Sequence, residues 1–531
     1  MPGSPRVTRR PRRASLLIAG APTMTYPKCP KCPTLATIAA AIGLAVTGCE
    51  DTPYAGVAAK CGSNGRDIAG LPAPAPVWTY AQADALYYAP RGADLDGDGR
   101  LEIIVTGGGE MPAAGEVVAL DGTTGAVRWR ATAETELYSS PVFLDVTGDG
   151  VLDVFVGGRL ESFLAVDGAS GDVLWRFEDT RPLPEYYFYN FYTPFLIADQ
   201  TGDGVPDLLV ANGGGDGIRP GEARPPGHLA VLNAVDGTLF AVGVMPDHQE
   251  TYMSPILLPD DGAASPTILF GSGGESWTGS LWEISLSSVL AGDLSDARAL
   301  VTGMGKGVIA PPALADLDRD GRLDIIVATF DGRLLAFSGA TREIIWQYGL
   351  ENTESYTTPS LGFFDGDDVP DVFAVFLHGV FPDYTSAERV LLSGRDGSLL
   401  WQGTAGDFAM AGDVAVDLNG DGTDEVIFNA NTINDPTVAP AAQQQLYLLD
   451  SAAGQVRPWG MPLGAIAPGS PWVGDLDADG CLDLVVPGHS SAEGSNDGLV
   501  TRFRVAAPAP ASIRWGGYFG TRFDSIVPDP R

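Results

Sequence analysis

Several features that mark other protein classes are scarce in this sequence. It has 32 Lys and Arg residues against 67 Asp and Glu residues, which gives a formal net charge of −35. A nucleic-acid-binding face needs an excess of basic residues, so this imbalance argues against a nucleic-acid partner. After residue 50, no long stretch keeps the 3.6-residue apolar period of an amphipathic helix, which argues against a helical fold.

Residues that commonly carry catalysis are also few. The chain contains no HExxH, GxSxG or P-loop motif and no adjacent cysteines. Its four histidines, His228, His248, His378 and His489, share no ligand spacing, so surface or turn positions explain them better than a metal site. Acidic residues are so numerous that no acid–base pair stands out. These absences favour a binding protein over an enzyme.

An apolar run at residues 34–48 follows two lysines and is shorter than a membrane-spanning helix. It ends in Val46-Thr47-Gly48-Cys49, which resembles a bacterial lipobox. The resemblance implies that residues 1–48 are a signal peptide and that Cys49 is lipidated. An Arg-rich stretch before Met24 leaves Met24 as an alternative start. We therefore expect a secreted, lipid-anchored protein in the periplasm or at the cell surface of a bacterium, touching the membrane only through its lipid.

Residues 49–76 are rich in Gly, Ala and Pro, which predicts a tether before a folded domain at residues 77–531. Removal of the signal peptide takes seven basic residues and no acidic ones, so the mature chain is still more acidic. An oxidising compartment permits disulfides. With Cys49 lipidated, Cys61 and Cys481 remain in the mature chain as a possible disulfide pair.

An internal repeat organises the rest of the chain. Six loops follow the pattern Asp-x-Asp/Thr/Asn-x-Asp-Gly-x-x-Asp/Glu, and they start at Asp94, Asp145, Asp199, Asp316, Asp417 and Asp475. A shortened loop spans Asp365 to Asp371, and a decayed one lies near residues 259–262. The eight units recur about every 54 residues.

Each unit predicts four short strands. In the second unit these strands are expected at residues 140–145, 154–157, 163–167 and 171–175. Four antiparallel strands, repeated around an axis, form the blades of a β-propeller, and each blade is covered by its neighbours. We therefore expect an all-β, eight-bladed β-propeller, or a seven-bladed one if the fourth unit is an insertion.

The spacing within the loops suits calcium. Oxygen ligands at positions 1, 3, 5 and 9, a backbone carbonyl at position 7 and a Gly turn at position 6 approach the roughly six to eight oxygens that calcium takes, whereas magnesium keeps its waters. A simple turn needs no third or fourth carboxylate, and clustered carboxylates repel one another without a cation. The expected ligands are Asp94, Asp96, Asp98, Glu102, Asp145, Thr147, Asp149, Asp153, Asp199, Thr201, Asp203, Asp207, Asp316, Asp318, Asp320, Asp324, Asp417, Asn419, Asp421, Glu425, Asp475, Asp477, Asp479 and Asp483.

These units resemble the FG-GAP and VCBS repeats of integrin alpha-subunit propellers and of many bacterial surface proteins. The resemblance covers residues 77–520, and it implies several calcium ions in the loops between first and second strands, on one face of the propeller. The shortened loop has Phe363 in place of the position-1 carboxylate, so it is not counted among the calcium loops.

A second resemblance concerns the fourth strands. Four segments resemble the tryptophan-docking repeat of pyrroloquinoline-quinone propellers, namely residues 119–129, 165–175, 336–346 and 391–401. In that family the tryptophan packs between blades, which implies a structural role here rather than a bound cofactor. Residues 77–80 and 513–515 also look like fourth strands, and one of them is expected to close the ring.

The opposite face, which carries the other strand connections, is rich in tyrosine. A dense group consists of Tyr186, Tyr187, Tyr189 and Tyr192. Long loops are expected on the same face at residues 212–227, 377–389 and 429–445. Aromatic rings with polar edges suit a carbohydrate or protein ligand, although the tyrosines could instead fill the central channel. The sequence thus predicts a calcium-binding envelope module for adhesion or protein interaction, with a polysaccharide lyase and an envelope assembly scaffold as alternatives.

Overall fold

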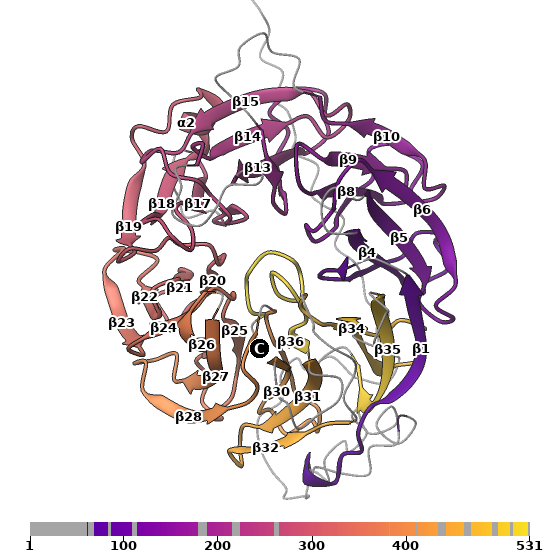
Figure 1. The fold of residues 1–531 in the computed structure, drawn as a ribbon, viewed down its shortest axis with the longest axis vertical. Coiled ribbons are helices and arrows are strands. Elements are labelled where there is room, and N and C mark those ends of the chain that lie inside the picture. Colours follow the sequence, from indigo (N-terminus) through magenta and orange to yellow (C-terminus); the bar gives the residue numbers. More distant parts are fainter. Residues whose placement is uncertain are drawn as a thin grey trace, which may run out of the picture. The chain divides into compact units, whose positions relative to one another are not determined.

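Eight antiparallel sheets lie in a ring around a common centre (Figure 1). The computed structural model describes residues 61, 68–82, 86–108, 114–178, 188–214, 224–259, 265–381, 383–409, 411–433, 442–460, 469–490, 497–509 and 513–528, all within one compact unit, Thr52–Arg531. The lipobox and Cys49 lie outside these residues. Within them, no helix is long and apolar enough to cross a bilayer; the longest is α2 (Leu286–Leu290).

Apart from the first and the last strand of the chain, the strands of each blade follow one another in the sequence from the centre of the ring outward. Blade 1 has β2 (Leu86–Tyr87), β3 (Arg91–Ala93), β4 (Glu102–Gly108), β5 (Gly115–Asp121) and β6 (Val127–Ala133). Blade 2 has β7 (Val142–Leu144), β8 (Asp153–Gly157), β9 (Phe163–Val166) and β10 (Val173–Arg176). Blade 3 has β11 (Asn190–Phe191), β12 (Phe195–Ile197), β13 (Asp207–Gly213), β14 (His228–Leu232) and β15 (Leu239–Val244). Blade 4 has β16 (Ile256–Leu257), β17 (Thr267–Gly271), β18 (Ser280–Ser285) and β19 (Arg298–Thr302).

The second half of the ring repeats this order. Blade 5 has β20 (Ala313–Ala315), β21 (Asp324–Thr329), β22 (Arg333–Phe337) and β23 (Ile344–Gly349). Blade 6 has β24 (Thr353–Glu354), β25 (Ser360–Gly362), β26 (Asp371–Val380), β27 (Asp383–Leu392) and β28 (Leu399–Thr404). Blade 7 has β29 (Val414–Val416), β30 (Glu425–Ile433), β31 (Ala442–Asp450) and β32 (Gln455–Pro458). Blade 8 has β33 (Trp472–Gly474), β34 (Cys481–His489), β35 (Gly498–Pro508) and, as its outer strand, β1 (Ala75–Gln82).

The predicted eight-bladed propeller is therefore confirmed, and the decayed fourth unit forms a blade of its own. Asp260 and Asp261, the acidic residues of its loop, lie outside the described residues. Two of the long loops expected on the tyrosine-rich face are wrong over the part that the structure describes. Residues 377–381 and 383–389 belong to the hairpin β26–β27, and residues 429–433 and 442–445 belong to the hairpin β30–β31, because cross-strand pairing continues along both.

Burial explains the strand sequences. The middle strands of a blade are covered on both sides by neighbouring blades, so β4 and β8 are buried at every residue. Outer strands face solvent on one side, so β6 alternates exposed and buried side chains. The apolar clusters lie between consecutive blades, and one of them joins Tyr87, Ile103 and Val105 of blade 1 to Val485 and Val500 of blade 8. This last cluster closes the ring by side-chain packing.

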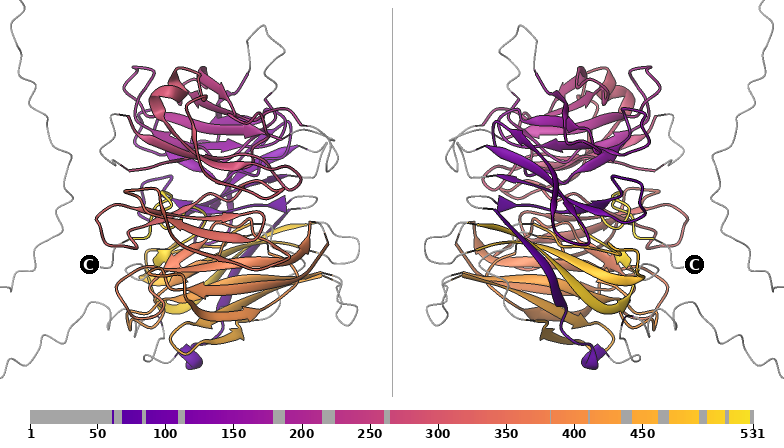
Figure 2. Two further views of the ribbon diagram at one scale, coloured as in Figure 1. Left: turned by 90° about the vertical axis from the view of Figure 1, so that its left-hand side faces the viewer. Right: turned by 90° about the vertical axis from the view of Figure 1, so that its right-hand side faces the viewer.

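Strand β1 closes the ring by main-chain pairing, since it completes blade 8 beside β35 (Figure 2). The chain before β1 is packed as well. Arg457 donates to the carbonyl of Leu71 at 2.7 Å, and the Trp459 indole donates to that of Pro72 at 2.9 Å. Ile68 and Leu71 are buried in the cluster between blades 7 and 8. The last third of the predicted tether is therefore part of the propeller.

A disulfide joins Cys61 to Cys481, with Cα atoms 5.5 Å apart across 420 residues of sequence. Cys481 begins β34, and it occupies position 7 of the last acidic loop. The disulfide thus fixes the segment before the first strand to the last blade.

Tryptophans of the outer strands connect blades 8, 1, 2 and 5 to the blade that follows each. The indole N–H of Trp129 in blade 1 donates to the Gly168 carbonyl of blade 2 at 2.7 Å, and its ring lies over Gly171. Gly171 has φ +80°, and a Cβ there would come within 2.6 Å of Trp129, so this turn requires glycine. Equivalent bonds run from Trp78 to Gly122, from Trp175 to Ala234 and from Trp346 to Gly394.

The C-terminal segment occupies the centre of the ring. Strand β36 (Ile513–Trp515) pairs with β29 as an additional inner strand of blade 7, so it does not close the ring. The chain then runs into the centre, drawn in yellow in Figure 1. There Phe519 is fully buried between blades 4 and 5, and Ile526 forms a parallel bridge with Leu314.

Candidate functional sites

The acidic loops and the tyrosine-rich segments lie at opposite ends of the innermost strands. In blade 1, Tyr88 precedes β3 and the loop Asp94–Glu102 follows it. A tyrosine holds the same place before the inner strands of blades 2, 3, 4 and 6, so the loops share one face and these tyrosines the other.

The six full loops have one hydrogen-bond scheme. The position-1 carboxylate accepts from the backbone N–H of position 6, as in Asp145 with Gly150 at 3.0 Å. The position-5 carboxylate accepts from the N–H of position 7, as in Asp149 with Val151 at 2.8 Å. Both contacts recur in the loops that start at Asp94, Asp199, Asp316, Asp417 and Asp475. These bonds hold the carboxylates on the inner side of a tight turn.

The position-9 carboxylates are buried, and they have a structural role in addition to any role as metal ligands. Asp153 is 1% exposed, and its two oxygens accept from the backbone N–H groups of Val146 at 2.8 Å and Gly168 at 3.2 Å. Asp324 repeats this arrangement with Leu317 and Gly339. Position 9 therefore links the loop to the turn between the third and fourth strands, which the sequence did not indicate.

Four loops bring ligand oxygens from three carboxylates within 4.8 Å of one another. These groups are Asp94, Asp96 and Glu102; Asp316, Asp318 and Asp320; Asp365, Asp367 and Asp371; and Asp475, Asp477 and Asp483. Oδ1 of Asp316 is buried and has no hydrogen-bond partner among the described residues. The remaining full loops have Thr147, Thr201 or Asn419 at position 3. An all-oxygen donor set with a partnerless buried carboxylate oxygen fits a hard divalent cation such as calcium.

Burial raises the free energy of those loop carboxylates that are ionised with no cation beside them. Burial and, to a smaller extent, the nearby Asp417 and Asp421 raise the pKa of the Glu425 carboxyl to about 9. Burial likewise raises the pKa of Asp324 to about 6. A divalent cation in these loops would offset the repulsion between the carboxylates.

Arginine side chains form ion pairs with the carboxylates of the first and last loops. Nη1 of Arg128 lies 2.7 Å from Oδ2 of Asp96 and 2.6 Å from Oε1 of Glu102. In the last loop, Arg502 bridges Asp477 and Asp483 at 2.7 and 2.9 Å. Within the described residues, no Lys or Arg pairs with the ligand positions of the loops at Asp145, Asp199, Asp316 and Asp417. Those four loops are therefore the candidate cation sites in which no internal arginine or lysine would compete with a metal ion.

The guanidinium of Arg128 would compete with a metal ion for the first loop. We expect Arg128→Ala to raise the calcium bound per molecule by one, because Asp96 and Glu102 lose their internal cation. Calorimetric titration of the chelator-treated protein measures this number. Arg130→Ala is the matched control, since Arg130 is on the same strand but pairs with Glu116. An equal stoichiometry in the two variants would contradict the prediction.

The shortened loop is more complete than its sequence suggests. Although position 1 holds Phe363, the three carboxylates of Asp365, Asp367 and Asp371 still converge. Asp367 pairs with Arg395 at 2.9 Å. This loop therefore resembles the first and last loops, in which an arginine already neutralises part of the acidic group.

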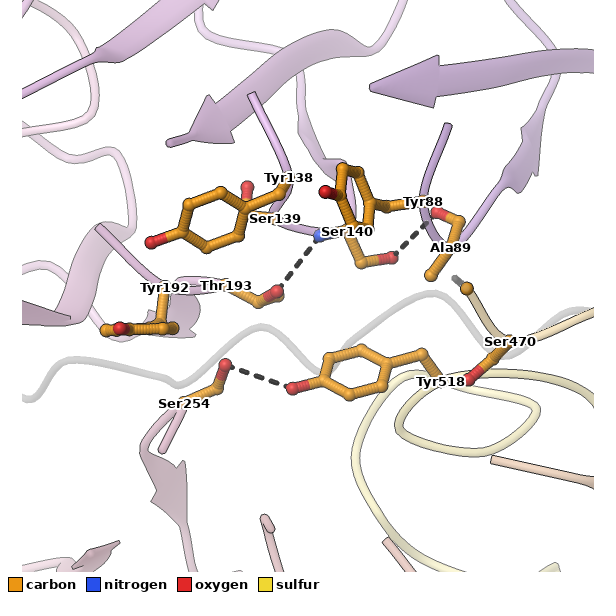
Figure 3. A pocket seen from close by; sticks show the side chains of 11 residues that line it. Tyr88, Ala89, Tyr138, Ser139, Ser140, Tyr192, Thr193, Ser254, Ser470 and Tyr518 are labelled. Carbon is orange, nitrogen blue, oxygen red and sulfur yellow. Dashed lines mark hydrogen bonds between the residues drawn. The ribbon is translucent and has the colours of Figure 1, made fainter. Parts of the chain in front are cut away.

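On the other face, tyrosine rings from successive blades form a continuous row. Tyr88 and Tyr138 have ring centroids 6.1 Å apart, Tyr138 and Tyr192 5.7 Å, and Tyr192 and Tyr252 5.9 Å. Figure 3 shows the first three of them beside Tyr518 of the C-terminal segment. Of the predicted ligand-face group, Tyr192 joins this row, Tyr189 precedes β11, and Tyr186 and Tyr187 lie outside the described residues.

Sequence reasoning missed a set of buried ion pairs behind these tyrosines. Glu136, Glu250 and Glu354 each stand two residues before a tyrosine and are at most 3% exposed. They pair with Arg159 at 2.5 Å, Arg224 at 2.9 Å and Lys306 at 2.7 Å, respectively. Glu136 also accepts from the Tyr88 hydroxyl at 2.5 Å. The recurring Glu-x-Tyr spacing was the available signal, and the pairs fix the tyrosine-bearing segments to their blades.

Comparison with known proteins agrees with the fold. Residues 94–156 match the family model of the FG-GAP-like repeat. No curated protein matches the chain. Similar solved structures include a europium-containing methanol dehydrogenase (10% identity, TM-score 0.54, 81% of this chain and 93% of that one). They also include a quinohemoprotein alcohol dehydrogenase from Comamonas testosteroni (12% identity, TM-score 0.53, 86% of this chain and 80% of that one). A third is the exotype rhamnogalacturonan lyase YesX (14% identity, TM-score 0.52, 82% of this chain and 76% of that one).

At such identities these structures are similar to the chain in fold alone. The fold defines the class of protein, an eight-bladed β-propeller of four-stranded antiparallel blades. The match at residues 94–156 identifies an FG-GAP-like repeat within it.

Proposed function

We propose that this chain is a calcium-stabilised binding module of a bacterial cell envelope. The observation that supports it best is the shared geometry of six acidic loops, in which the same backbone N–H groups hold carboxylates at the same positions. Turn formation alone does not require this clustering of negative charge. Calcium in the loops would stabilise one face of the ring and leave the other face for a ligand.

The tyrosine-rich face is the proposed ligand-binding face. Its row of aromatic rings spans at least four blades, and it is held by buried ion pairs rather than by loops alone. Tyrosines combine apolar ring faces with polar hydroxyls, a combination suited to carbohydrate or protein ligands. A binding role needs no catalytic group on this face.

Attachment to the membrane is proposed to depend on Cys49. We expect Cys49→Ser to move the protein from the membrane fraction to the soluble secreted fraction, because a lipid on this cysteine is the proposed anchor. Fractionation of cells that express either form, followed by immunoblotting, measures the change. A Cys61→Ser variant should stay in the membrane fraction. Retention of the Cys49→Ser variant there would show that another anchor exists.

The binding role is tested by screening the calcium-loaded protein against a glycan array and against envelope proteins. The proposal expects a ligand that binds without being altered. The same preparation is incubated with acidic polysaccharides while unsaturated products are followed by absorbance. Product formation there would contradict a purely binding role and favour a lyase.

A further inference from the structure

A small cavity opens where the tyrosine row meets the C-terminal segment (Figure 3). Its volume is about 150 Å³. Side chains from blades 1, 2, 3 and 4 line it, together with the segment before blade 8 and the C-terminal segment. The lining residues are Tyr88, Ala89, Tyr138, Ser139, Ser140, Tyr192, Thr193, Ser254, Gly469, Ser470 and Tyr518.

The chemistry of this lining is uniform. Nine of its eleven residues carry a hydroxyl group, and none of them carries a charged side chain. The tyrosines stay neutral, because burial raises the pKa of Tyr518 to about 12 and that of Tyr138 further. A charged ligand would lose its hydration here without gaining a counter-charge, so the lining selects against carboxylates, phosphates and metal ions.

The hydroxyls have hydrogen-bonding capacity left over. Each can donate once and accept twice. Ser470 accepts from the Gly412 N–H at 2.9 Å, and Thr193 accepts from the Ser140 N–H at 3.0 Å, which leaves their own protons to donate. The buried hydroxyl of Tyr138 interacts with that of Tyr192, and a hydroxyl pair of this kind still has acceptor capacity to spare. A ligand with several hydroxyls, each both donor and acceptor, would complement these groups.

Size restricts the ligand further. A protein cavity of ~150 Å³ accommodates one six-membered ring, since benzene fills an engineered apolar cavity of that size. The cavity has no room for a dinucleotide or a folded peptide. The tyrosine rings supply flat apolar surfaces against which the C–H groups of a sugar ring can pack.

We propose that this cavity binds one uncharged pyranose unit, either as a free monosaccharide or as the terminal residue of a glycan. The proposal rests on the binding role stated above and assigns that role a site and a ligand class. Tyr138 and Ser254 both line the cavity, and they are the residues chosen to test contact with the sugar. Oγ of Ser254 lies 3.1 Å from the Tyr518 hydroxyl, and it can make a further hydrogen bond to a ligand (Figure 3).

The test uses the full chain and two series of probes. Neutral hexoses, a 6-deoxyhexose and their methyl glycosides are compared with galacturonate and glucuronate by saturation-transfer NMR and calorimetry. Oligosaccharides that end in the best monosaccharide then distinguish a free sugar from a glycan terminus. We expect at least one neutral pyranose to bind, and the corresponding uronate to bind more weakly.

Two variants locate the site. Tyr138→Phe keeps the ring and removes one hydroxyl of the lining, so it should leave the fold intact and weaken sugar binding about fivefold or more. Ser254→Ala should do the same, and it gives a second test if the first variant misfolds. Tyr348→Phe, on the outer strand β23, is the matched control and should bind as the unmodified protein does.

Three results would overturn the proposal. They are equal affinity for a neutral sugar and its uronate, unchanged affinity in both cavity variants, or no neutral sugar bound at millimolar concentration. If the protein binds glycans on the array and the cavity variants bind them with unchanged affinity, the cavity assignment fails and the binding function survives. If neither the array nor the protein screen yields a ligand, both the cavity assignment and the proposed binding function fail.

Discussion

Removal of calcium is expected to lower the melting temperature of the protein by roughly 5–10 °C. Each site that is filled at about 100 times its dissociation constant stabilises the folded state by ~2.7 kcal/mol, provided that the unfolded chain does not bind the ion. Four loops have the full spacing and no arginine among their ligand positions, so the combined effect is several times this value. The physical reason is the repulsion between buried carboxylates, which a divalent cation offsets.

Calorimetric scans in calcium and in excess chelator measure this difference. Magnesium at the same concentration is the control, because it holds its waters and demands a tighter octahedral geometry than these loops offer. It should restore little of the lost stability. An identical melting temperature in calcium and in chelator would show that the loops are turns without a stabilising ion.

Loss of the Cys61–Cys481 disulfide is expected to cost up to ~6 kcal/mol in the chain-entropy model. The effect is large because the bond closes a loop of 420 residues and so restricts the unfolded chain strongly. It also holds the segment that leads into β1, the strand that completes blade 8. Without the bond, this junction keeps the main-chain pairing of β1, the hydrogen bonds from Arg457 and Trp459, and apolar packing that includes Ile68 and Leu71.

The double variant Cys61→Ser with Cys481→Ser is compared with the unmodified protein by urea unfolding, in the presence and absence of reductant. Reductant should destabilise the unmodified protein and leave the variant unchanged. Mass spectrometry of a non-reduced digest gives an independent check. Two unlinked thiols in protein isolated from the envelope would contradict the structure at this point.

The repeat made the propeller predictable. Because each acidic loop is flanked by short apolar strands, the spacing of the loops indicated both the number of blades and the order of strands within them. Ring closure was not predictable, since Trp78 and Trp515 lie in short strands of similar composition. Only the three-dimensional pairing shows that β1 joins β35 and that β36 joins the inner edge of blade 7.

The candidate sites were predictable to a smaller extent. The carboxylates at positions 1, 3, 5 and 9 follow from the spacing, but the arginines that bridge some of them do not. Arg128 is 26 residues after Glu102, and Arg502 is 19 residues after Asp483, so strand pairing alone brings each pair together. The cavity could not be predicted from the sequence either. Ser254, Ser470 and Tyr518 lie far apart in the chain, and they meet only where the closed ring surrounds the C-terminal segment.

Calcium binding by the acidic loops is tested most directly by counting the ions. Chelator-treated protein is titrated with calcium in a calorimeter, alongside Asp145→Ala, which removes the position-1 ligand of one loop without an arginine. Because blades contribute semi-independently to stability, the variant should keep its fold. The account predicts about four ions per molecule for the unmodified chain and one fewer for the variant. Absence of calcium binding, or the same number in both proteins, would contradict it.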